Sequence, residues 1–157
     1  AIGGTTTDVR AVNLPDGKKA IAMGPGQDHI CALLEGGQVQ CWGKDWNKQL
    51  GGLGENSDAG QTLAASGAIG VAAGQFHTCI AFDDGHVECI STGQSEGAGL
   101  DAGAFTTVTN VTSAVAITAG KHYTCALESD HTVKCWGRIG GGTTPVTVTG
   151  PKVAACP

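Results

Sequence analysis

Seven cysteines offer the clearest chemistry in this 157-residue chain, because a thiol can form a disulfide or ligate a metal ion. Six of them fall into three pairs whose members lie ten positions apart: Cys31 and Cys41, Cys79 and Cys89, and Cys125 and Cys135. The seventh, Cys156, has no partner at this spacing. An odd number leaves at least one thiol over, so we expect Cys156 to be free or to form an intermolecular bond.

A metal site is the alternative for the paired cysteines. His29 and His77 lie two residues before a cysteine and would supply imidazole ligands. Structural zinc sites, however, favour cysteines separated by only about two to four residues. The third pair also has Tyr123 where the others have histidine. We therefore expect three disulfides, with neither a metal ion nor a cofactor.

The cysteine pairs belong to an internal repeat. Residues 26–43 read GQDHICALLEGGQVQCWG, residues 74–89 read GQFHTCIAFDDGHVEC, and residues 120–137 read GKHYTCALESDHTVKCWG. The first cysteines of successive copies lie 48 and then 46 positions apart, a period typical of propeller blades. No copy brings an acid, a base and a nucleophile together in a recurring constellation, so we expect no enzymatic activity.

Each copy predicts a β-hairpin with a three-residue turn, at residues 35–37, 83–85 and 129–131. Such a turn places Cys31 directly opposite Cys41, with Leu33 and Val39 on the same face and Ala32 and Gln40 on the other. Opposed residues of an antiparallel pair lie at a separation that suits a disulfide. Each closed loop would then stabilise the fold by about 3 kcal/mol.

Two further segments accompany each hairpin. Short apolar runs precede the hairpins and predict buried inner strands, at residues 21–23, 71–73 and 117–119. Threonine-rich segments, which we place upstream of the inner strands as edge strands, lie at residues 4–7, 106–109 and 142–145. The sequence therefore predicts an all-β fold of about three propeller-like, four-stranded antiparallel blades, each with one disulfide-stapled hairpin.

Several motifs make the sequence similar to a known family. Residues 71–79 (VAAGQFHTC), residues 31–43 (CALLEGGQVQCWG) and residues 48–51 (KQLG) resemble repeats of the regulator of chromosome condensation type, in their secreted, cysteine-bearing variety. The resemblance implies that each repeat forms a four-stranded blade, and that typically seven blades close a β-propeller. Ile90 and Ser91 replace the Trp-Gly of the other copies, and the third copy lacks the Gln-Leu-Gly that follows the first.

The repeat predicts one domain over residues 1–157, with opening strands in 1–25, hairpins in 26–43, 74–89 and 120–137, and the strands of an incomplete fourth unit in 142–157. Three units do not close a propeller, and the ends of an open array must be capped or paired. We therefore expect a structural or interaction protein that associates with itself head to tail, as a filament or a closed ring, with Cys156 able to seal the joint.

A binding module for a carbohydrate or a protein is the alternative function. Its rim would use Trp42, Trp46, Trp136, Tyr123 and histidine side chains. Trp42 and Trp136 follow the second cysteine of a hairpin, a repeat-fixed position that favours packing. Trp46 has no counterpart in the other copies and is the better rim candidate.

Charge and targeting signals restrict the setting. Nine Lys and Arg against 14 Asp and Glu give a net charge of −5 without a basic run, which argues against nucleic-acid binding. No apolar stretch is long enough to span a membrane. The cysteine content and the initial Ala1 favour a secreted, extracellular protein. Asn110 begins an N-x-[ST] sequon and is a candidate glycosylation site.

Overall fold

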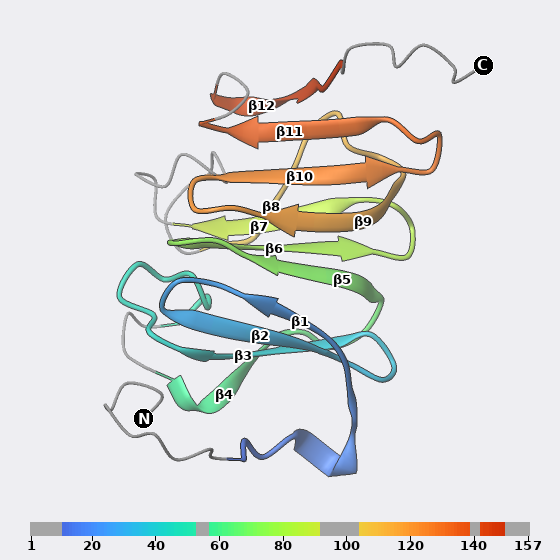
Figure 1. The fold of residues 1–157 in the computed structure, drawn as a ribbon. Helices are drawn as coiled ribbons and strands as arrows, with labels where there is room; N and C mark the ends of the chain where they lie inside the picture. The colour runs from blue at the N-terminus through green and yellow to red at the C-terminus, as the bar shows by residue number, and fades with distance from the viewer. Residues whose placement is uncertain (1–10, 53–56, 92–103, 139–141, 150–157) are drawn as a thin grey trace, which may run out of the picture.

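The computed structural model describes residues 11–52, 57–91, 104–138 and 142–149. These residues form three four-stranded antiparallel sheets, stacked one on the next like the blades of a propeller (Figure 1). A single 3-10 turn, η1 (Pro15–Gly17), precedes the first sheet. The predicted all-β, blade-like architecture is confirmed.

Each sheet is a meander whose spatial order follows the chain order. The first contains β1 (Ala20–Pro25), β2 (His29–Leu34), β3 (Gln38–Gly43) and β4 (Ser57–Ala64). The second contains β5 (Ala68–Ala73), β6 (His77–Phe82), β7 (Val87–Ser91) and β8 (Thr106–Thr107). The third contains β9 (Ala114–Ala119), β10 (Tyr123–Glu128), β11 (Val133–Gly137) and β12 (Gly142–Thr147).

The central hairpin of each sheet has the predicted register. Cys31 pairs with Cys41 and Leu33 with Val39 across β2 and β3. The last residue of each three-residue turn has a positive φ, 76° at Gly37, 88° at Gly85 and 69° at His131. This geometry brings the paired Cα atoms to 4.0–4.1 Å, and all three predicted disulfides are formed, at Cys31–Cys41, Cys79–Cys89 and Cys125–Cys135.

The outer strands correct one part of the predicted unit. They follow the hairpin of their own sheet rather than precede it, because β4, β8 and β12 hydrogen-bond to the free edges of β3, β7 and β11. The prediction that residues 142–157 begin a fourth unit is therefore wrong for β12, which completes the third sheet. Residues 4–7 and Cys156, on which the remainder of that prediction depends, lie outside the described residues.

The two faces of every sheet have different partners. We call the face that carries the disulfide the cysteine face, and the opposite one the tryptophan face, after Trp42 and Trp136. Cys31, Leu33 and Val39 on the cysteine face of the first sheet pack on Ile80 and Val71 of the second. In the same way, Cys79, Ala81 and Val87 pack on Ala126 and Trp136 of the third. The core is thus the set of joints between successive sheets.

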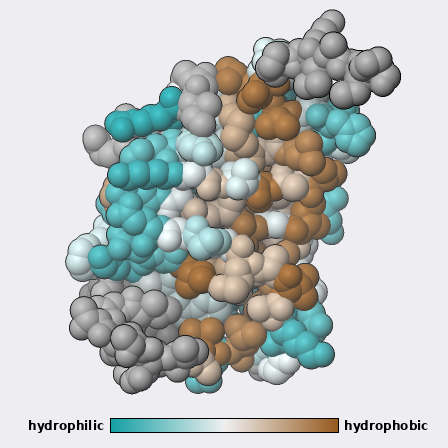
Figure 2. Space-filling view, in the orientation of Figure 1, coloured by the Kyte–Doolittle hydropathy of each residue, from teal (hydrophilic) through white to brown (hydrophobic). Residues whose placement is uncertain are grey.

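The prediction of buried inner strands is confirmed for residues 71–73, whereas residues 21–23 are exposed and residues 117–119 are half-buried or exposed. Ile21, Ile69 and Val115 are 61%, 41% and 50% exposed. Each is the extra residue of a register shift at the same place in β1, β5 and β9, as in a β-bulge. The bulge turns one apolar side chain per sheet out of the core, and Figure 2 shows a hydrophobic band running along the stack.

The disulfides can be ranked by burial. Cys79 and Cys89 are fully buried, whereas Cys125 is only half-buried, and all three loops have the same length. Removing Cys125–Cys135 by a double change to alanine should lower the free energy of unfolding by about 3 kcal/mol, through loop entropy alone. Removing Cys79–Cys89 should cost about 1 kcal/mol more, because it also leaves a cavity. Urea unfolding under non-reducing conditions measures both values, and equal losses would contradict the ranking.

Candidate functional site

Successive sheets are joined by a buried contact between a histidine and a threonine. His29 Nε2 lies 2.9 Å from Thr78 Oγ1, and His77 Nε2 lies 3.0 Å from Thr124 Oγ1. In each case the histidine stands two residues before the first cysteine of its sheet, and the threonine one residue before the first cysteine of the next sheet. We call this pair the His–Thr latch. Because the latch is present at both joints, the same contact joins the first sheet to the second and the second to the third.

The imidazole at each latch rests on a glycine. A Cβ placed on Gly26 would lie 2.7 Å from the His29 ring, and one placed on Gly74 would lie 2.0 Å from the His77 ring. A backbone hydrogen bond of 2.9 Å closes the turn between each glycine and its histidine. Only a residue without a side chain leaves room for the ring, which explains why glycine recurs at this point of the repeat.

Burial keeps both imidazoles neutral. It lowers the pKa of His29 to about 4, although the nearby Asp28 carboxylate opposes the shift. Burial also lowers the pKa of His77 to about 4, with a smaller contribution from the positive charges that His29 and His122 carry when protonated. Thr78 donates its hydroxyl hydrogen to Gln49 O at 2.8 Å, so it accepts from His29, whose ring hydrogen must be on Nε2.

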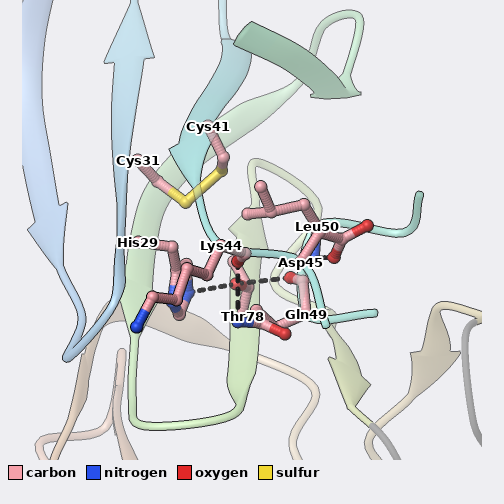
Figure 3. The surroundings of a disulfide bond; sticks show 8 residues. All are labelled: His29, Cys31, Cys41, Lys44, Asp45, Gln49, Leu50 and Thr78. Atoms are coloured by element: carbon pink, nitrogen blue, oxygen red, sulfur yellow. Dashed lines mark hydrogen bonds between the residues drawn. A yellow bond between two sulfur atoms is a disulfide. The ribbon is translucent and has the colours of Figure 1, made fainter. Parts of the chain in front are cut away.

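The loop after β3 is tied to the same latch (Figure 3). Asp45 Oδ1 accepts from Leu50 N at 2.6 Å, and Gln49 Nε2 donates to Lys44 O at 2.7 Å. Asp45, Gln49 and Leu50 are buried, and Thr78 of the second sheet anchors the loop through Gln49 O. Residues 44–50 therefore form a hydrogen-bonded loop that is anchored to the joint between the first two sheets.

Trp46 is presented to solvent by this loop. Its side chain is 65% exposed, although its neighbour Asp45 is buried. The Lys44 ammonium lies 5.0 Å from the centre of the indole ring, within the range of a cation–π contact. Lys44 is in turn held by Asp28 at 3.1 Å. Trp46 is therefore exposed, as a rim residue must be, and its contact with a ligand stays a prediction.

The other predicted rim residues are not exposed together with Trp46. Trp42 and Trp136 are buried against core residues, which agrees with the packing interpretation. His29 and His77 are enclosed between sheets, so these two histidines do not contribute to a rim. Tyr123 is half-buried on the third sheet.

Several other features bear on the predicted sites. Asn110 is exposed with a φ of 64°, so its side chain is accessible, and its glycosylation stays a prediction. Within the described ranges, no group of three or more His, Cys, Asp or Glu could hold a metal ion. In the same part of the chain, no helix is long and apolar enough to cross a membrane.

The two outward faces of the stack form a second candidate site. On the cysteine face of the third sheet, Leu127 is 37% exposed and Val133 half-buried, whereas their counterparts Leu33 and Val39 are buried. At the opposite end, Leu14 packs on the tryptophan face of the first sheet. A pocket of about 300 Å³ remains on this face, and apolar side chains dominate its lining: Val12, Leu14, Ala20, Met23, Ile30 and Trp42.

Sequence reasoning predicted two uncovered ends of the blade array but missed the latch. The signal for the latch was present, because the middle copy reads His-Thr-Cys while each outer copy keeps only one of its two latch residues. Contact between those residues could not be inferred without knowing that a histidine meets the threonine of the next sheet and not that of its own.

The latches predict that acid destabilises the protein. The unfolded chain takes up protons at histidine below about pH 6.5, whereas the folded histidines resist protonation down to about pH 4. The free energy of unfolding should therefore fall as the pH drops through this window, by up to about 3 kcal/mol per histidine. A His77→Gln variant, whose amide does not titrate, should lose about half of this decrease.

Urea unfolding of the wild type and the variant at pH 7 and pH 4.5 checks this expectation, since their difference cancels the contribution of the carboxyl groups. His131→Gln, at an exposed histidine, is the matched control and should behave as the wild type. Parallel pH profiles for the wild type and His77→Gln would contradict a neutral, buried His77.

Comparisons with known proteins agree on the type of repeat. Residues 19–48 match the family profile of the regulator of chromosome condensation (RCC1) repeat. No curated protein matches the sequence. The fold is similar to that of yeast RCC1 (Prp20) in its complex with Kap60, with a TM-score of 0.70 and 18% identity over 83% of this chain and 37% of that one.

Two further structures extend the comparison. Human WBSCR16 gives a TM-score of 0.72 at 19% identity over 87% of this chain and 41% of that one. The ectodomain of the Physcomitrella patens receptor kinase CR4 gives 0.55 at 22% identity over 83% and 33%. The chain thus spans well under half the length of the structures it matches. The fold of its three sheets is similar to that of blades of the regulator of chromosome condensation type, and residues 19–48 match the repeat itself.

Proposed function

We propose that the chain is a non-enzymatic interaction module that associates with further copies of itself through the two outward faces of its blade stack. The observation that carries the proposal is the exposure of Leu127 on the cysteine face of the third sheet, at a position where the first two sheets are covered. At the other end of the stack, the first sheet presents its tryptophan face. In both internal joints, the tryptophan face of one sheet covers the cysteine face of the preceding sheet.

This pairing would be head to tail. The two faces of a joint differ in their residues, so copies joined in this way share a direction, and the assembly closes as a ring or grows as a filament according to the rotation between blades. The proposed association repeats the arrangement of the internal joints, in which a cysteine face packs on a tryptophan face. Cys156 would be able to seal the joint covalently.

An extracellular setting supports the proposal. Three disulfides in a chain of this size suit an oxidising compartment. The exposed sequon at Asn110 is compatible with a secreted glycoprotein. The fold also serves protein binding elsewhere, since yeast RCC1 (Prp20) was crystallised bound to Kap60.

A charge on the exposed cysteine face tests the self-association. Leu127→Glu should weaken it about 10- to 100-fold, because a carboxylate would be buried against apolar side chains in the joint. Light scattering over a range of protein concentrations measures the mass of the particle. Val115→Glu is the matched control, because Val115 is similarly exposed and is a bulge residue like Ile69, which stays exposed although both faces of its sheet are covered.

Two results would count against self-association. The first is a wild type that keeps the mass of one chain at every concentration. The second is an equal loss of mass in Leu127→Glu and Val115→Glu.

Carbohydrate binding at Trp46 is a second candidate function. The observation that favours it is the presentation of an exposed indole on a hydrogen-bonded loop, with Lys44 beside its ring. An aromatic ring held in one orientation can stack on the apolar face of a sugar at little entropic cost. The same loop is fixed by the His29–Thr78 joint, so a ligand here would contact a surface that the fold keeps in place.

A glycan array of the wild type, followed by titration of any glycan it retains, tests this candidate. Trp46→Ala should weaken binding by about 2 kcal/mol, or about 30-fold, as expected for a central aromatic contact. Met23→Ala, which truncates an exposed apolar side chain elsewhere, should bind as the wild type. Equal binding by Trp46→Ala and the wild type, or an array without a bound glycan, would exclude Trp46 as a carbohydrate site.

A further inference from the structure

Tyr123 occupies the latch position of the third sheet. A Cβ on Gly120 would lie 2.3 Å from the Tyr123 ring, and Gly120 N donates to Tyr123 O at 2.9 Å. These are the contacts that seat His29 on Gly26 and His77 on Gly74. The Tyr123 ring thus packs on a glycine in the same way as the two latch histidines, and it lies on the outward cysteine face of the stack.

Ile30 occupies the opposite latch position. It stands one residue before the first cysteine of the first sheet, where the second and third sheets carry the accepting threonines Thr78 and Thr124. Ile30 is half-buried on the outward tryptophan face and lines the pocket of about 300 Å³. The internal latches are therefore polar at both positions, and the two outward latch positions are apolar or aromatic.

The two outward residues match each other and not the internal ones. A histidine placed against Ile30 would leave its buried N–H group without the acceptor that a threonine supplies, which is unfavourable. A tyrosine ring placed against Ile30 buries apolar surface on both sides, and its hydroxyl, at the tip of the longer side chain, has to reach water or a polar group beyond Ile30. Tyrosine in place of histidine and isoleucine in place of threonine both make the surfaces that would face each other at this joint less polar.

The backbone offers a second match at this joint. Gly37 O accepts from Ala68 N at 3.0 Å between the first two sheets, and Gly85 O accepts from Ala114 N at 2.9 Å between the next two. The corresponding groups on the outward faces are His131 O, in the turn of the third hairpin, and Ala20 N, at the start of β1. A joint between two copies can therefore repeat the backbone contact of the internal joints, while the side-chain contact differs.

We propose that the partner at the outward cysteine face is the first sheet of a second copy of this chain, selected by insertion of Tyr123 beside Ile30 in the apolar pocket. The inference rests on the self-association proposed above and names the residue pair that specifies it. A blade with threonine at the Ile30 position would be a poorer partner for Tyr123, so the pair distinguishes the joint between copies from the joints within one.

A swap of the latch residues on the full chain tests the pair. Tyr123→His places a histidine against Ile30 and should weaken self-association about tenfold. Ile30→Thr places a hydroxyl in the apolar pocket opposite Tyr123 and should weaken it by a similar factor. The double variant carries a complete His–Thr latch and should regain most of the wild-type affinity. Light scattering against concentration measures all four proteins.

The outcomes separate the two proposals. A wild type that stays a single chain overturns both the self-association and the residue pair. A wild type that associates, with single variants of unchanged affinity or a double variant weaker than both, overturns the pair alone. Histidine and threonine are the residues that the other sheets carry at these positions, and unchanged urea midpoints at low protein concentration establish that the variants fold.

Discussion

The structure depends on one interaction, the packing of the cysteine face of one sheet on the tryptophan face of the next, which buries the disulfides of the first and second sheets. A single sheet of this chain has few large aromatic side chains with which to build a core of its own. The core residues accordingly come from two sheets at a time, as in the cluster formed by Cys31, Leu33, Val71 and Ile80. Because the two faces differ, the stack has a direction, and direction is what makes extension by further blades possible.

Close approach at the joints explains where much of the glycine lies. A Cβ on Gly24 would lie 2.8 Å from Val71 O, one on Gly37 would lie 2.6 Å from Gly67 N, and one on Gly85 would lie 2.6 Å from Thr112 O. Each of these contacts is with the backbone of the neighbouring sheet or of the segment that leads to it. The joints are thus backbone against backbone in places, which allows small residues to build a core that aromatic residues build in other folds.

The features predicted from the sequence are those that depend on neighbours along the chain. The hairpins and their disulfides follow from the ten-residue spacing and a three-residue turn, both local. The predicted order of strands is wrong for the outer strands, which follow the hairpin of their sheet and do not precede the inner strand. A segment such as β12 has the same sequence neighbours whichever sheet it joins, so its sheet is not evident from the sequence. The exposure of Ile21 is not predictable from the short apolar run from which burial is inferred, because such a run does not reveal a bulge. Trp46 was identified as the exposed tryptophan because it alone had no counterpart in the repeat.

The disulfides also have a mechanical consequence. Each one closes a hairpin within its own sheet, so none of the three crosses a joint. Under tension the blades are therefore free to separate one at a time, since only non-covalent contacts hold them together. Within each released blade, however, the residues between the two cysteines cannot extend. Each disulfide thus shortens the contour length of the chain by about 35 Å, and the stack would yield in short steps rather than unravel to its full length.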